Sequence, residues 1–510
     1  MKIKPDDIEI PRDDPFQHDL LDRIQPALIL TNLLLNTESP YTMSIDASWG
    51  NGKTTFLEMW KQHLKNEDFA VVGFNAWETD FAQCPLLALT SELLHSLESL
   101  DHDGDLRLDA IATTLPRFLK VALTKAVPWT ISAAGVIGAV QVNDPMVALA
   151  GQTVAAGVSG VVEEVVRTEP SDDLPEPLTY IEAKEVINSF RNALANTAEK
   201  LSEKHDGIPL VIAIDELDRC RPSYAVELLE IAKHFFSVKD IVFVLTVDKA
   251  QLSHAIKAIY GNDFDAIGYL RRFVDLDFRL PDPNRKDLMN HLMDNTGINA
   301  FFEKYPGSSW GRSSDSKTLL RAFLSLPTLS IRQIQQSLHH LGLVLASLDT
   351  NNEIAYGAIA VLTILKTIDP VIYQRFVKAD ITDKEVSEHL FSMPGLQSIK
   401  GTSIEALFEA LLILGYGEFA VMNNIPITTG PSLFHHYFHI IESLPRFPMH
   451  DITAIDNLSP PLSDHEQQVL NGIKSLGYAF SMIPSGAAVG FDRTTQRLEL
   501  FSNDLIGDNS

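Results

Sequence analysis

This sequence has few cysteines, fewer basic than acidic residues, and no apolar signal core among its first residues. Its 510 residues include two cysteines, Cys84 and Cys220, which excludes a disulfide framework or a four-cysteine zinc site and favours a reducing compartment. Lysine and arginine number 41 against 67 acidic residues, for a formal net charge of -26. That balance argues against extensive direct contact with nucleic acid, which requires clustered basic residues. The first residues carry no apolar signal core, so we expect a cytoplasmic protein.

One stretch, residues 44–55, has the residue order of a phosphate-binding loop. A short apolar segment leads into small residues, then Gly52, Lys53 and Thr54, then a helix-like run. Glycine lets backbone N–H groups approach phosphate oxygens, and the following helix directs its positive end at the anion. We expect Lys53 to reach the β- and γ-phosphates of ATP and the Thr54 hydroxyl to ligate Mg²⁺. The other predicted contacts of this loop with the nucleotide come from Trp49, Gly50, Asn51, Gly52 and Thr55.

Ala47 stands where the usual pattern of such a loop has its first glycine. Alanine is tolerated there unless the position needs a positive φ angle, so we expect a working loop. The alternative is a chance Gly-Lys-Thr at a helix start, and a second motif further along the chain argues against it.

That second motif lies at residues 209–220, where a continuous apolar run ends in carboxylates. The pattern is typical of a buried parallel strand whose carboxyl end faces the ligand crevice of an open α/β sheet. We expect Asp215 to hold the Mg²⁺ shell and Glu216 to orient or deprotonate the attacking water. Another apolar strand ends at Thr246 and Asp248, either of which is a candidate sensor of the γ-phosphate. The alternative for the acidic residues is capping of the next helix.

Three arginines are candidates for nucleotide contacts. Arg271 and Arg272 are predicted to stabilise the transferring phosphoryl group in a neighbouring subunit, with surface salt bridges as the alternative. Arg332 lies in the first turn of a helix that Ser330 is predicted to cap, and we expect it to fold back onto the nucleotide as a lid residue. Because Arg271 and Arg272 are predicted to act in a neighbouring subunit, they suggest a homo-oligomer.

Residues 121–167 differ in composition from the rest of the chain. They hold two uncharged runs rich in alanine and glycine, and each run approaches the ~18–20 residues that cross a bilayer. Basic residues flank the pair, which suits a hairpin with both ends cytoplasmic. A close-packed soluble hairpin and an amphipathic interfacial pair are the alternatives. An acidic, proline-rich linker follows at residues 168–178.

The combination of motifs resembles the KAP family of P-loop NTPases. The specific marks are Ser-Trp-Gly-Asn-Gly-Lys-Thr-Thr at residues 48–55, Phe-Asn-Ala-Trp at 74–77 and Ile-Asp-Glu-Leu-Asp-Arg-Cys-Arg-Pro at 214–222. Residues 19–23 and 269–281 are similar too, and the resemblance covers about residues 15–345.

The resemblance implies a membrane-spanning insertion between the two nucleotide motifs, which many members carry, and a role in signal transduction or, in bacteria, in phage defence. This sequence departs from the family pattern at Ala47 and at Glu216, where members often have a second Asp. We still expect hydrolysis, because glutamate is the water-activating carboxylate in related ATPases.

Together these features predict an α/β fold with a three-layer P-loop NTPase core on a parallel sheet. The expected parts are the first NTPase segment at 1–120, a helical insertion at 121–167, the second NTPase segment at 168–285, a helical lid at 286–345 and a mostly helical C-terminal domain at 346–510.

The predicted function is a Mg²⁺-dependent ATPase, a conformational switch or assembly ATPase in a bacterial anti-phage system. Its predicted partners are other proteins of a defence or signalling complex, in the cytoplasm or at the inner membrane. The alternative is a nucleotide-binding scaffold that organises partners without hydrolysis.

Overall fold

The computed structural model describes residues 9–81, 85–101, 106, 108, 110–114, 180–308, 311–348, 355–423, 433, 462–475 and 491–500. These residues form two compact units, the first ending at Pro281 and the second beginning at Asp282. The predicted hairpin at 121–167 and the linker at 168–178 lie outside the described residues. Within the described ranges, no helix combines the length and apolar character needed to span a membrane.

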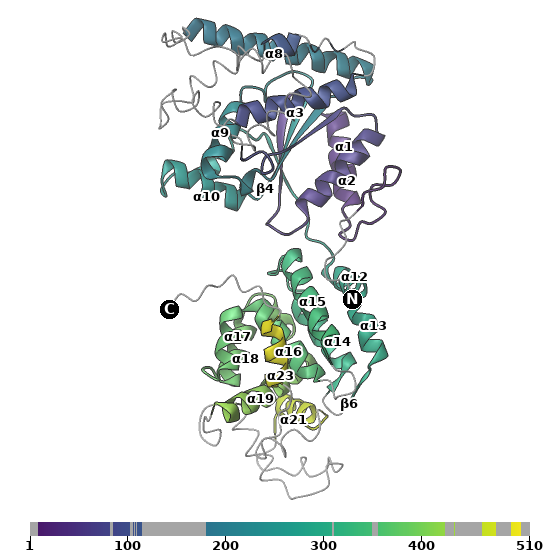
Figure 1. Ribbon diagram of the computed structural model, residues 1–510, viewed down its shortest axis with the longest axis vertical. Coiled ribbons are helices and arrows are strands. Elements are labelled where there is room, and N and C mark those ends of the chain that lie inside the picture. The colour runs from purple at the N-terminus through teal and green to yellow at the C-terminus, as the bar shows by residue number, and fades with distance from the viewer. Residues whose placement is uncertain are drawn as a thin grey trace, which may run out of the picture. The chain divides into compact units, whose positions relative to one another are not determined.

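A five-stranded parallel sheet forms the centre of the first unit (Figure 1), with the strand order β2-β3-β4-β1-β5. Its strands are β1 (Tyr41–Asp46), β2 (Val71–Asn75), β3 (Leu210–Asp215), β4 (Ile241–Val247) and β5 (Leu276–Arg279). Strand β4 therefore separates β1, which enters the predicted phosphate loop, from β3, which ends in the predicted metal ligand. The register pairs Asp215 with Asn75 on one side and with Thr246 on the other, so the strand ends meet at one edge of the sheet.

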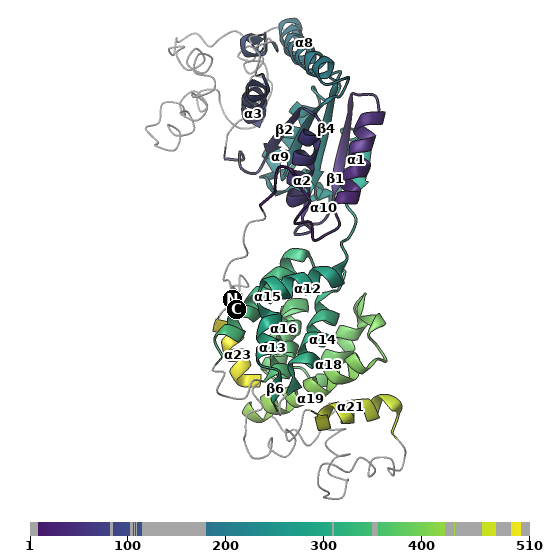
Figure 2. The same ribbon diagram turned by 90° about the vertical axis from the view of Figure 1, so that its right-hand side faces the viewer.

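Helices cover both faces of this sheet (Figure 2). Its inner strands are buried on both faces, which explains why β3 and β4 are continuous apolar runs. One face packs on α1 (Ile24–Asn36) and α2 (Lys53–Asn66). The other packs on α3 (Pro85–Leu100), α8 (Tyr180–Lys204), α9 (Pro222–Ala232) and α10 (Lys249–Tyr260). The predicted three-layer core with a parallel sheet is confirmed.

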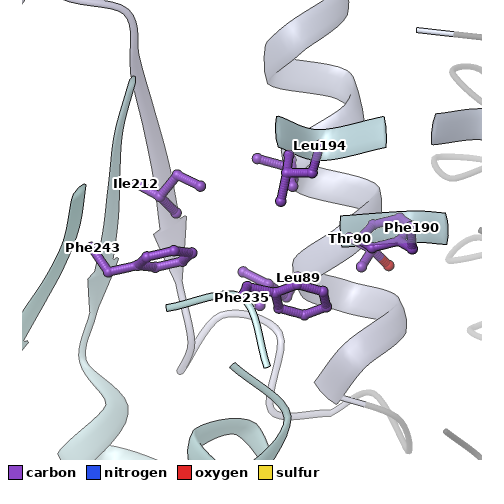
Figure 3. A pocket seen from close by; sticks show the side chains of 8 residues that line it. Leu89, Thr90, Phe190, Leu194, Ile212, Phe235 and Phe243 are labelled. Atoms are coloured by element: carbon purple, nitrogen blue, oxygen red, sulfur yellow. The ribbon is translucent and has the colours of Figure 1, made fainter. Parts of the chain in front are cut away.

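A small apolar cavity of ≈ 10 Å³ lies in the second of these layers, between α3, α8 and the sheet (Figure 3). It has room for about one water molecule. Its lining consists of Leu89, Thr90, Leu93, Phe190, Leu194, Ile212, Phe235 and Phe243. Ile212 and Phe243 pair in the middle of β3 and β4, before the strand ends that carry Asp215 and Thr246. The cavity is thus a packing defect of the core, separate from the edge where the motifs meet.

The second unit is built mainly of helices around α16 (Tyr356–Ile368), which is apolar and buried along most of its length. Residues from the predicted lid and from the predicted C-terminal domain both belong to this unit. A short antiparallel pair, β6 (Gly307–Ser308) with β7 (Gly311–Arg312), interrupts a stretch that the sequence predicts as helical, because glycine opens each of its strands. Its other helices are α12 (Arg285–Asn295), α13 (Ile298–Lys304), α14 (Ser313–Leu324), α15 (Ile331–Ala346), α17 (Pro370–Val377), α18 (Asp383–Ser392), α19 (Ser403–Met422), α21 (Asp464–Ser475) and α23 (Phe491–Leu500).

Candidate nucleotide-binding site

The loop between β1 and α2 has the backbone that phosphate binding requires. Gly50 and Gly52 have φ angles of 77° and 78°, a region that is costly for residues with a side chain. A Cβ on Gly52 would lie 3.0 Å from the Leu21 Cδ1 atom, a tight contact that would displace this side chain. Helix α2 begins at Lys53 without a side-chain cap, which leaves its first N–H groups for an anion. Ala47 is not among the described residues with positive φ, so its side chain strains nothing.

Lys53 lies inside this loop with its ammonium group buried. Its side chain is 9% exposed, and Nζ donates a 2.5 Å hydrogen bond to the Ala47 carbonyl. The Asp218 Oδ2 atom lies 3.8 Å from the same nitrogen. A buried ammonium held by one carbonyl and one carboxylate is a positive charge kept at the loop, as the predicted contact with phosphates needs.

Asp215 and Glu216 lie side by side where β3 ends. Burial raises the pKa of Asp215 to about 6, and hydrogen bonds from Thr54 and from the Glu216 N–H partly oppose that shift. The Thr54 hydroxyl oxygen also lies 3.3 Å from Glu216 Oε1, so its single O–H is shared between the two carboxylates. Glu216 itself has a φ of 59°, unusual for a residue with a side chain, so its orientation is imposed by its surroundings. The structure thus brings together Thr54, Asp215 and Glu216, as the sequence predicts.

Two tryptophans connect the acidic motif to the segments that follow β1 and β2, which the sequence did not reveal. The Trp49 indole N–H donates to Asp218, whose other oxygen is buried and accepts nothing from the described residues. Burial raises the pKa of Asp218, although the nearby Lys53 opposes the shift. Arg219 forms an ion pair with Glu216, and its guanidinium carbon lies 5.7 Å from the centre of the Trp77 ring. Spacing in the sequence shows neither pair, because each depends on how two side chains turn.

Cys220 completes the Asp-Arg-Cys run at the same place. It is buried, and its Sγ atom donates to the Glu216 carbonyl over 3.6 Å. Burial raises the pKa of this thiol to about 12, with nearby carboxylates adding to the shift. A thiol that holds its proton so firmly is a poor nucleophile, so Cys220 supports the backbone at Glu216.

Strand β4 brings its two predicted sensor residues to the site in different ways. Thr246 is fully buried, and its hydroxyl finds no partner among the described residues. Asp248 instead accepts hydrogen bonds from the backbone N–H groups of Trp49, Ala250 and Gln251, at 3.0, 3.1 and 3.2 Å. Its carboxylate thus anchors the loop and caps α10, and its predicted contact with the nucleotide stays a prediction. Thr246 is the β4 side chain with an unused polar group.

The predicted arginines are exposed. Arg271 and Arg272 follow the short helix α11 (Ala266–Leu270) in the first unit. Arg332 lies in the first turn of α15 in the second unit, behind a capping box that Ser330 forms with Gln333. The cap is as predicted, whereas the contact of each arginine with a nucleotide stays a prediction. Of the remaining loop residues, Asn51 and Thr55 are half-buried and Trp49 is 44% exposed.

The sequence motifs also gave no role to Arg23, which proves to be in contact with the loop. Its guanidinium donates to the Asn51 carbonyl at 3.0 Å and to the Pro281 carbonyl. The Asp19–Arg23 stretch was visible only as part of a family resemblance, since nothing in its own spacing indicates a partner so far along the chain.

A parallel sheet with a phosphate loop after β1 and a carboxylate pair after β3 defines a P-loop NTPase. The sequence matches the KAP family P-loop domain over residues 23–348, more than half of the chain. The chain belongs to the KAP family.

Comparison with a curated relative gives a weaker match. The phage T7 exclusion protein of Escherichia coli (strain K12) is 23% identical over 186 residues, which cover 36% of this chain. Those residues span 24% of the relative's own length, about a quarter.

Solved structures are similar only at a low level. The ORC2 protein of Aeropyrum pernix, in complexes with ADPNP and ADP, has a TM-score of 0.32 and 11% identity, covering 91% of this chain and 93% of its own. A Drosophila ORC structure with poly(dA/dT) DNA and Cdc6 has a TM-score of 0.29 and 11% identity, covering 94% and 61%. Similarity this low supports no argument about the site.

Proposed function

We propose that this chain binds ATP with Mg²⁺ and hydrolyses it, and that it acts as a conformational switch or assembly ATPase. The observation that carries the proposal is the convergence of Lys53, Thr54, Asp215 and Glu216 at one edge of the sheet, with Thr54 and Glu216 3.3 Å apart. These four side chains supply the groups that phosphoryl transfer to water needs: a positive charge, two oxygen ligands and a base.

The donor set fits a magnesium ion. Mg²⁺ prefers oxygen ligands and is commonly held by one or two carboxylates together with the phosphates of its nucleotide. Asp215 is a buried carboxylate, and within the described residues no lysine or arginine forms an ion pair with it. A raised pKa of about 6 marks a charge that lacks stabilisation, and a cation supplies it. Thr54 and Asp215 would hold the ion, which when bound neutralises charge that develops on the phosphates.

Glu216 is the proposed base, and two side chains contact its carboxylate. Its Oε1 atom accepts from Thr54 and also pairs with Arg219. While Oε1 is held by both groups, this oxygen is not positioned to take a proton from water. Activation of water by Glu216 therefore requires that the Arg219 contact loosens. Lys53 would stabilise phosphate charge throughout, and Thr246, on the strand between the two motifs, has a hydroxyl without a partner in the described part of the chain.

The assembly and its biological role belong to the same proposal. The exposed positions of Arg271 and Arg272 are compatible with reaching the nucleotide of a second copy, as a homo-oligomer would require. The similarity to a phage T7 exclusion protein supports a role in anti-phage defence, together with partner proteins of such a system. A cytoplasmic or membrane-associated location stays a prediction.

A second candidate function is a scaffold that binds nucleotide without hydrolysing it. The ion pair between Glu216 and Arg219 favours it, since a base that never leaves its guanidinium partner activates no water. In that case nucleotide would still bind through Lys53 and Asp215 and fix the conformation of the loop.

Purified protein assayed for ATP hydrolysis over a range of concentrations distinguishes the two. We expect turnover that falls by at least about 100-fold in Glu216→Gln with nucleotide still bound, and that disappears in Lys53→Ala together with binding. A rate per subunit that rises with concentration would support assembly. Tight binding of Mg²⁺-ATP without turnover at any concentration would favour the scaffold, and no binding at all would overturn both.

A further inference from the structure

We propose that Arg23 couples the state of the phosphate loop to the segment that joins the two units, so that nucleotide binding alters the second unit. The inference rests on the proposed function in one respect, which is that a nucleotide binds this loop. Hydrolysis is not required for it.

The buried side chain of Arg23 links two points that are far apart in the sequence. One guanidinium nitrogen donates to the Asn51 carbonyl at 3.0 Å, and another donates to the Pro281 carbonyl. The residue is 2% exposed. A guanidinium is planar and presents its donors in a fixed fork, so two carbonyls bound to it keep a fixed relative position. A displacement of one carbonyl is therefore passed to the other.

The Asn51 end of this link is in the part of the loop that responds to phosphate. Asn51 immediately precedes Gly52 and Lys53, where α2 begins. Since a trans peptide is planar, a carbonyl directed at Arg23 turns the N–H of Gly52 in the opposite direction. Phosphate oxygens are bound through such loop N–H groups, so ligand binding and the Arg23 contact act on the same peptide plane.

The Pro281 end is the last residue of the first unit, and Asp282 begins the second. The neighbouring residue, Leu280, donates its N–H to the Asp46 carbonyl at 3.0 Å. Asp46 is the last residue of β1, where the phosphate loop starts. The exit segment is thus attached to both ends of the loop, directly at Asp46 and through Arg23 at Asn51. A change in loop conformation changes both attachment points.

The backbone that carries Arg23 is itself held firmly, so it transmits displacement. The Asp19 carboxylate accepts hydrogen bonds from the backbone N–H groups of Leu21 and Ile24, both at 3.0 Å, and from that of Arg23. The Leu21 side chain packs closely against Gly52 in the loop, and a Cβ there would lie 3.0 Å from its Cδ1 atom. The Asp19–Arg23 segment therefore moves with the loop.

The test compares full-length wild type with Arg23→Lys and Arg23→Ala, each with Mg²⁺ and a non-hydrolysable ATP analogue. Lysine keeps the charge but cannot bridge two carbonyls with a planar fork. Arg12→Ala removes an exposed arginine of the same unit and is the matched control. The measurements are analogue affinity and hydrogen exchange in residues 282–348. We expect analogue to slow exchange there by at least about threefold in wild type and control.

In Arg23→Lys we expect affinity within about fivefold of wild type but most of that exchange response lost. A full response in both Arg23 variants would overturn the inference, as would analogue binding to wild type with no change beyond Pro281. If neither variant binds the analogue, Arg23 serves the loop alone and the coupling is rejected. Wild type that binds no analogue would instead overturn the proposed function on which the inference rests.

Discussion

Buried acidic side chains occur in both units, but the two units satisfy them differently. Among the described residues, the carboxylates that are less than a tenth exposed are Asp215, Glu216, Asp218 and Asp248 in the first unit, and Asp383, Glu405 and Glu409 in the second. Burying a carboxylate is unfavourable unless hydrogen bonds or opposite charges compensate. The buried carboxylates of each unit therefore need hydrogen-bond donors or positive charges close to them.

In the second unit the fold itself supplies the partners. Glu409 on α19 accepts a 2.6 Å hydrogen bond from Ser387 on α18 and pairs with His465 on α21 at 2.7 Å. Glu405 accepts from the Gly401 N–H, and Asp383 accepts from the N–H of Lys384 at 2.9 Å. Glu409 thus joins α19 to α18 and α21, and each of the three carboxylates has a hydrogen-bond donor within the protein.

At the sheet edge of the first unit the compensation is incomplete for Asp215 and Asp218, whereas Glu216 pairs with Arg219 and Asp248 accepts three backbone hydrogen bonds. Asp215 forms no ion pair with any described lysine or arginine. The Oδ1 atom of Asp218 accepts no hydrogen bond from any described residue. The raised pKa of each records the deficit. Burial of an acid is therefore no sign of function by itself, whereas burial without sufficient partners marks a candidate site for a cation or ligand.

The largest expected effect is that of Asp215→Asn, which tests the unsatisfied side of the comparison. Removing the carboxylate removes a proposed Mg²⁺ ligand, so we expect affinity for Mg²⁺-ATP to fall by about 100-fold or more. The free protein should become more stable at pH 8, by up to about 3 kcal/mol, because a poorly compensated buried charge is gone. Nucleotide titration and thermal unfolding of the same preparations measure both effects.

The gain in stability expected for Asp215→Asn should change with pH in a definite direction, which provides a control. Burial raises the pKa of Asp215 from 3.8 to about 6, so the folded state binds this proton more tightly than the unfolded chain. The resulting stability is fully present below pH 3.8 and is lost as the pH rises through about 6. The advantage of Asn over Asp should therefore shrink as the pH falls from 8 to 5. A variant that is less stable than wild type at pH 8 would contradict the comparison.

The next effect, from Glu409→Ala, tests the satisfied side. The substitution leaves the buried Ser387 hydroxyl without its acceptor and removes the contact of His465, so we expect unfolding of the second unit to become about 2–3 kcal/mol easier. Affinity for Mg²⁺-ATP should stay within about twofold of wild type. Chemical denaturation and nucleotide titration check the two parts. Glu409→Gln, which keeps an acceptor for Ser387, should lose less stability than Ala.

The sequence predicted the carboxylates of the sheet edge far better than it predicted the partners of the other buried acids. Thr54, Asp215 and Glu216 could be placed together because a P-loop has a fixed residue order and parallel strands end at a common edge. The partners of Asp248 could not, since whether a carboxylate binds a ligand or caps a helix depends on the side-chain rotamer. Nor could the contact between Glu409 and Ser387, because pairs across helices follow from packing and leave no periodic pattern.

The bridge from Arg23 to Pro281 was equally out of reach. Its two acceptors are main-chain carbonyls, which every residue possesses, so no residue type at position 51 or 281 marks them. Strand order was also underdetermined: buried apolar runs predict parallel strands, but not that β4 stands between β1 and β3. The predicted contacts of Arg271, Arg272 and Arg332 with a nucleotide stay predictions, because they concern the nucleotide itself.

The smallest effect should come from Ala47→Gly, which restores the usual first glycine of the loop. Ala47 contributes its backbone to the site: its carbonyl accepts from Lys53 at 2.5 Å and its N–H donates to the Val247 carbonyl at 3.3 Å. Because φ is not positive there, glycine relieves no strain and only adds freedom to the unfolded chain, at about 0.5–1 kcal/mol of stability. We expect affinity for Mg²⁺-ATP to change by less than about threefold in a direct titration. Binding that tightens tenfold would mean that the Ala47 methyl group obstructs the phosphates. The poorly compensated carboxylates would then not be the only feature of the site that limits nucleotide affinity.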